Sequence, residues 1–97
     1  MKIELSKADY EYTKEILTEV DSSAYDPVYR GMIERMEATK KTKANEVSVI
    51  LEEFEIFNVL EAFNYYTDAL EVRGNTEEIK KASALTKKVS ASTGLSL

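Results

Sequence analysis

The pattern of apolar positions predicts a chain of helices. Met1–Leu5 alternates polar and apolar residues, as a short strand would. We expect an extended lead-in, or an edge paired across a dimer, because a lone strand has no partner in a helical chain. A narrow apolar stripe then predicts a first helix over residues 6–20, with Ser6 as its N-cap. The stripe consists of Tyr12, Ile16, Leu17 and Val20.

A second helix is predicted over residues 27–39. Asp26 supplies an acceptor for the N-cap, and Pro27 suits the first helical position because its missing N–H costs nothing there. Residues 39–43 are polar and basic, which is typical of a connection or of a frayed helix end. The apolar face of this helix consists of Tyr29, Met32, Ile33 and Met36.

The longest predicted helix covers residues 45–73, with Asn45 as its cap and Gly74 as the residue that ends it. It carries two apolar stripes rotated relative to each other, so it must be covered on more than one side. A rival interpretation makes Glu46–Leu51 a strand, since Val47, Val49 and Ile50 are β-branched. We favour the helix because helical spacing continues beyond residue 51. The stripes are formed by Val47, Ile50, Leu51 and Phe54, and by Ile56, Val59, Leu60, Phe63, Tyr66 and Leu70; Phe57, Tyr65, Ala69 and Val72 widen the second.

A fourth helix is predicted over residues 76–90, capped either by Asn75 with Glu78 or by Thr76 alone, and followed by a tail over 91–97. The sequence therefore predicts one all-α domain, a four-helix arrangement around the long helix with a short extended lead-in. Three short helices cannot comfortably cover both apolar stripes. We therefore expect a homodimer, a higher oligomer or a partner that fills a groove.

Composition narrows the chemistry. The chain has no His and no Cys, which excludes the common general base, the common nucleophile pairs and most transition-metal sites. It carries no phosphate-binding glycine motif, so we expect no enzyme, cofactor or metal. The net charge of −5 argues against direct nucleic-acid binding. Without an apolar leader or a membrane-length apolar run, we expect a cytoplasmic protein.

Tyrosines and lysines are the candidate interaction residues. Tyrosine is enriched at interface hot spots, although the helical spacing of Tyr29 and Tyr66 also fits the edge of a core. Lysines between the second and third predicted helices suit a phosphate or an acidic partner, or simply a solvated connector. The candidate residues are Tyr25, Tyr29, Tyr65, Tyr66, Lys40, Lys41 and Lys43.

Two stretches resemble, in compositional style, small helical proteins of phages and prophages of low-GC bacteria. One is the opening Met1–Ser6, which runs straight into a helix. The other is Leu60–Tyr66, followed through Gly74 and Asn75 into Glu77–Ala82. The resemblance covers roughly half of the chain. It implies a protein that binds and blocks host machinery such as a defence system or RNA polymerase.

The sequence thus predicts a non-enzymatic protein-binding module that acts by occupying a surface of its target. Two alternatives stay open. An acidic DNA mimic would present carboxylates in two rows, although the interspersed lysines count against it. An oligomeric small-ligand binder would hold a nucleotide with Tyr and Lys between subunits.

Overall fold

The computed structural model describes residues 1–23 and 28–97. These residues are mostly helical, as predicted, but they also form a small sheet. Residues 24–27 lie outside the described residues. In chain order the elements are β1 Lys2–Ser6, α1 Lys7–Ser23, α2 Arg30–Thr39, β2 Lys41–Lys43, β3 Glu46–Ile50, α3 Glu53–Arg73 and α4 Thr76–Thr93.

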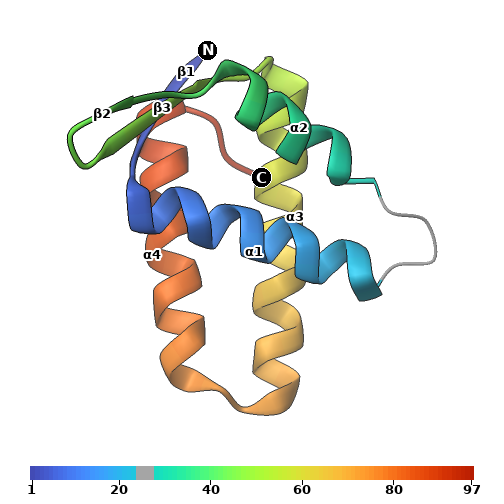
Figure 1. Cartoon of the computed structure of the whole chain (residues 1–97). Helices are drawn as coiled ribbons and strands as arrows, with labels where there is room; N and C mark the ends of the chain where they lie inside the picture. Colours follow the sequence, from blue (N-terminus) through green and yellow to red (C-terminus); the bar gives the residue numbers. More distant parts are fainter. Residues whose placement is uncertain (24–27) are drawn as a thin grey trace.

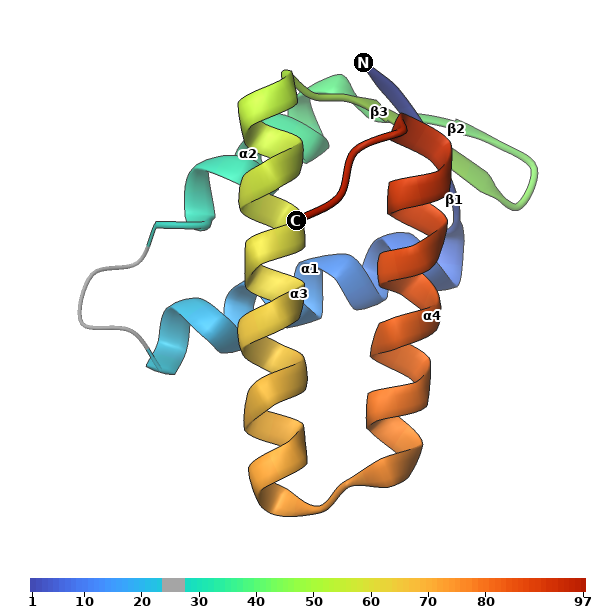
Figure 2. The same cartoon turned by 180° about the vertical axis from the view of Figure 1, so that it is seen from behind.

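Helices α3 and α4 form an antiparallel hairpin, and α1 crosses one face of it (Figure 1). The sheet lies at the end of the hairpin where α3 begins and α4 ends. Seen from behind, α1 is on the far side, and the C-terminal tail runs from α4 back toward α3 (Figure 2). The main contacts of α3 are with α1 and α4, whereas α2 contacts β3 and α1.

The prediction of an unpaired lead-in was wrong, because β1 is a strand of an antiparallel sheet with the order β1-β3-β2. Lys2 lies opposite Ile50, and Ser6 lies opposite Glu46. Ile3 and Leu5 are buried while their neighbours are exposed. Alternation therefore puts one face of β1 into the core.

The predicted helix over 45–73 was wrong in its first eight residues, and the strand interpretation of residues 46–51 fits instead. Val47 and Val49 are buried on one face of β3. Asn45 lies in the turn between β2 and β3 rather than at a helix cap, and its carbonyl accepts a hydrogen bond from the Lys7 N–H at 2.9 Å. Helical spacing begins only at α3, where Glu52 and Glu55 form a capping box.

The other helix ends agree better with the sequence. Ser6 Oγ accepts a hydrogen bond from the Asp9 N–H at 3.1 Å, as expected of an N-cap. Gly74 ends α3 in the left-handed conformation, with φ of 71°. Asn75 Oδ1 accepts a hydrogen bond from the Glu78 N–H and caps α4. That helix continues to Thr93, so the tail is shorter than predicted.

The start predicted for the second helix at Asp26 and Pro27 lies outside the described residues. Within the described part, α2 begins at Arg30, three residues after the predicted start. No helix among the described residues is long and apolar enough to span a membrane. The core draws on every helix and on two strands; its largest fully buried side chains are those of Tyr10, Phe63, Ile16, Leu17, Met36, Leu51, Ile56 and Leu60.

Candidate functional site

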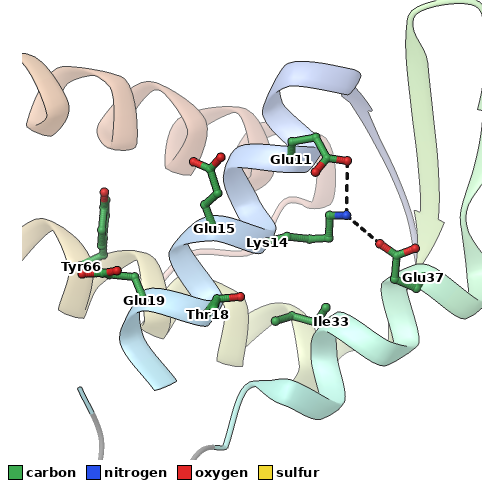
Figure 3. Close-up of a pocket in the computed structure, with 8 residues that line it drawn as sticks. All are labelled: Glu11, Lys14, Glu15, Thr18, Glu19, Ile33, Glu37 and Tyr66. Atoms are coloured by element: carbon green, nitrogen blue, oxygen red, sulfur yellow. Dashed lines mark hydrogen bonds and ion pairs between the residues drawn. The ribbon is translucent and has the colours of Figure 1, made fainter. Parts of the chain in front are cut away.

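A groove of about 580 Å³ lies between α1 and α2 and is bounded at one end by α3. Figure 3 shows that its lining side chains come from these three helices and that Lys14 reaches toward Glu11 and Glu37. Tyr66 and Glu19 lie toward one end of the groove, and Glu11 and Glu37 lie toward the other. The lining residues are Glu11, Lys14, Glu15, Thr18, Glu19, Ile33, Glu37 and Tyr66.

Helix α1 supplies the acidic wall of the groove. Glu11, Glu15 and Glu19 are four residues apart, so they share one face, with about 6 Å of helical rise between neighbours. The opposite face of α1 holds Ile16 and Leu17, which are fully buried. Burial of that face therefore orients the three glutamates toward the solvent.

Asp21 fixes the position of the second wall. Its carboxylate accepts hydrogen bonds from the backbone N–H groups of Val28 and Tyr29, each at 2.9 Å. This contact ties the end of α1 to the residues just before α2. Ile33 and Glu37, four residues apart on α2, then face the groove (Figure 3).

Glu37 makes three side-chain contacts at one end of the groove. It accepts a hydrogen bond from the Tyr10 hydroxyl at 2.9 Å, and it pairs with the ammonium groups of Lys14 at 2.8 Å and Lys40 at 3.1 Å. The hydrogen bond from Lys14, followed by those from Lys40 and Tyr10, lowers the pKa of Glu37 to about 2. Glu37 therefore stays ionised at neutral pH and is a poor proton donor.

Lys14 is shared between the two walls. Its ammonium lies 3.3 Å from a carboxylate oxygen of Glu11 as well as 2.8 Å from Glu37, and it sits 4.9 Å from the centre of the Tyr10 ring. The hydrogen bond to Glu37 is the main reason that the pKa of Lys14 is raised. Lys14 is thus a permanent cation that holds the walls together.

The groove keeps an excess of negative charge. Four glutamates against one lysine give its lining a net charge of −3. Glu15 makes no ion pair among the described residues, and Ile33 and Tyr66 add apolar surface beside the charges. This combination suits a cation with an apolar stem, such as a lysine or arginine side chain.

A smaller cavity of about 90 Å³ borders the groove between α1 and α3. Glu19 and Tyr66 line both spaces, and Tyr65 lines only the smaller one. The Tyr66 ring meets the Tyr12 ring edge to face, with 6.3 Å between their centroids. The tyrosine pair at 65 and 66 therefore joins the groove to the outer side of α3.

The structure disperses the other predicted interaction residues. Tyr29 is buried and donates its hydroxyl to Glu61 at 2.8 Å, while Tyr25 lies outside the described residues. Lys40 follows α2 and pairs with Glu37. Lys41 and Lys43 lie on β2, opposite Ser48 and Glu46. Of the described candidates, Tyr66 lines the groove, Tyr65 lies beside it, and Lys40 reaches it through its ion pair with Glu37.

Sequence reasoning missed the groove itself. The four-residue spacing of Glu11, Glu15 and Glu19 was the available signal for an acidic helix face. No local pattern shows that Glu37 and Ile33 lie opposite that face, because this depends on how α2 packs. Among the described residues, no group of three His, Cys, Asp or Glu could hold a metal ion.

Comparisons with known proteins identify no related protein. The chain matches no protein-family model, and neither the curated proteins nor the solved structures contain a significant match.

Proposed function

We propose that the chain is a non-enzymatic protein-binding module whose α1–α2 groove receives a basic side chain of a partner protein. The observation that carries this proposal is the open groove with a net charge of −3 beside Ile33 and Tyr66. Carboxylates next to apolar surface attract a lysine or arginine and cover its stem. Binding would occupy the partner's surface without chemistry.

The charge of the groove also weighs against a nucleotide ligand, since four carboxylates repel phosphate. Helix α1 presents one row of glutamates, broken by Lys14, whereas an acidic DNA mimic calls for two clean rows. We therefore favour a protein partner. The phage-like style of the sequence supports a host protein, such as a defence system or RNA polymerase, as the target class.

The test is a titration of ¹⁵N-labelled protein with a short capped peptide containing arginine and lysine, at 150 mM salt. We expect the amide shifts to concentrate at Glu15, Thr18 and Ile33. Glu15→Lys reverses one unpaired charge in the groove and should weaken binding by about tenfold, because it replaces an attraction with a repulsion.

The matched control is Glu71→Lys, which makes the same change of charge on an exposed residue of α3 outside the groove. It should bind the peptide as the wild type does. Equal losses in both variants would mean that the peptide senses only net charge. That result, or shifts spread over all acidic faces, contradicts the proposal.

A further inference from the structure

The outer side of α3 carries large apolar side chains that remain in water. The exposed fractions are 63% for Phe54, 55% for Tyr65 and 91% for Val72. At 3.6 residues per turn, positions 54, 61, 65 and 72 fall on one line along the helix, about 27 Å long. We call this line the outer strip, formed by Phe54, Glu61, Tyr65, Asp68 and Val72.

The described elements leave most of the outer strip open; Tyr29, just before α2, reaches it with its hydroxyl, which donates to Glu61 at 2.8 Å. The opposite side of α3 buries Ile56, Val59 and Phe63 in the core. Helices α1 and α4 make the main contacts with α3, whereas Phe54, Tyr65 and Val72 stay largely in water. Single exposed apolar residues are ordinary, but three large ones aligned on one helix form a docking pattern.

Charge decides which occupant fits. Helix α3 carries five acidic residues and one basic residue, Arg73, so its net charge is −4. Glu61 and Asp68 lie on the outer strip itself, and Asp68 makes no ion pair among the described residues. A second copy would bring two acidic helices together, which like-charge repulsion opposes. A basic partner is attracted instead.

We infer that the outer strip docks an amphipathic helix of a partner protein, with apolar residues facing Phe54, Tyr65 and Val72 and with lysines or arginines beside them. The basic residues would lie near Glu61 and Asp68. Two helices in such contact pack side by side along their apolar faces. This surface is separate from the α1–α2 groove, although Tyr65 lies where the two approach each other.

The probe is a synthetic amphipathic helix of about 20 residues, matched to the length of the strip, with leucines on one face and lysines on the flanks. Two control peptides have glutamates in place of the lysines, or the same composition in scrambled order. Fluorescence anisotropy at 150 mM salt should show binding of the lysine peptide, and at least about tenfold weaker binding of both controls.

Variants of the protein then locate the site. Val72→Ser and Tyr65→Ser should each weaken peptide binding by about five- to tenfold, because each removes an apolar anchor. The matched control is Val28→Ser, which makes the same change at another exposed valine and should leave binding unchanged. Asp68→Lys should weaken binding of the lysine peptide and improve binding of the glutamate peptide.

Three outcomes would overturn the inference. In the first, Val72→Ser and Val28→Ser bind equally. In the second, Glu15→Lys abolishes peptide binding while the strip variants do not, which leaves the groove proposal standing and removes this one. In the third, light scattering shows a wild-type dimer that Val72→Ser dissociates, which makes a second copy the occupant. If only the groove proposal fails, Glu15→Lys binds the short basic peptide as the wild type does, while Val72→Ser and Tyr65→Ser still weaken binding of the helical lysine peptide.

Discussion

At the scale of single residues, buried tyrosines meet glutamates at the rim of the core. Tyr10, Tyr12 and Tyr29 donate their hydroxyls to Glu37, Glu78 and Glu61 at 2.8–2.9 Å. Burial first, and the bonded carboxylate second, raises the pKa of each phenol. Each ring fills core volume while its polar end is satisfied, which is why Tyr29 lies in the core edge rather than on an exposed patch.

The lowered pKa of Glu37 predicts how the free energy of unfolding depends on pH. This pKa is about 2 in the folded protein against an ordinary value of 4.5. Between these values the unfolded chain binds a proton that the folded chain does not, so the free energy of unfolding falls as the pH falls. We expect Glu37→Gln to flatten the decrease in stability from about pH 4.5 to pH 2, measured by urea unfolding.

The control for this experiment is Glu34→Gln on the same helix. Glu34 is exposed and makes no ion pair among the described residues. The control should keep the wild-type pH dependence. If Glu37→Gln also kept it, the ion pairs of Glu37 with Lys14 and Lys40 would not stabilise the folded protein.

At the scale of elements, the sequence predicted what is decided locally. Ser6, Gly74 and Asn75 act at helix ends because their side chains or backbone freedom satisfy groups within a few residues. The strand β3 was the rival interpretation, since Val47 and Ile50 fit both the helical spacing and the β-branched preference of a strand over so short a segment. Whether residues 46–50 form a helix or a strand depends on their pairing with β1 and β2, and the residues of β1 lie 40 to 48 positions earlier in the sequence than their partners.

The cap of α4 gives a prediction at this scale. Asn75→Ala should lower the free energy of unfolding by about 1 kcal/mol, because the Glu78 N–H loses its acceptor. The corresponding fall in melting temperature for a domain of this size is about 4–8 °C. Asn75→Asp retains an acceptor at this position and should melt near the wild type; a similar loss in both variants would assign the effect to the turn instead.

At the scale of the whole molecule, exposure separates residues that the sequence treats alike. Phe54 and Phe63 both lie on α3, yet Phe63 is fully buried and Phe54 is 63% exposed. Phe63→Ala should therefore cost about 3–5 kcal/mol by leaving a cavity, a large share of the stability of a small domain. Phe54→Ala should cost less than about 0.5 kcal/mol. Chemical denaturation measures both, and equal losses would contradict the packing described here.

The excess apolar surface expected of the long helix persists on the whole molecule, but in a different form. Residues 47–51 no longer belong to that helix, and Val47, Val49 and Leu51 are buried with the sheet. Ile50 stays half-exposed on β3, and on α3 itself the large apolar side chains that remain in water are those of the outer strip. The groove could not be predicted in the same way, because it exists only where α1 and α2 meet across Lys14 and Glu37.

The pairing of β1 with β3 also has a consequence for how the chain folds. Lys2 pairs with Ile50, 48 positions later, so closing the sheet requires a long loop to form first, while each helix needs only neighbouring residues. During synthesis at roughly 5–20 residues per second, β1 waits several seconds for its partner to emerge. Over that interval Ile3 and Leu5 stay without the cover of β3, so β1 is among the last elements to reach its native contacts.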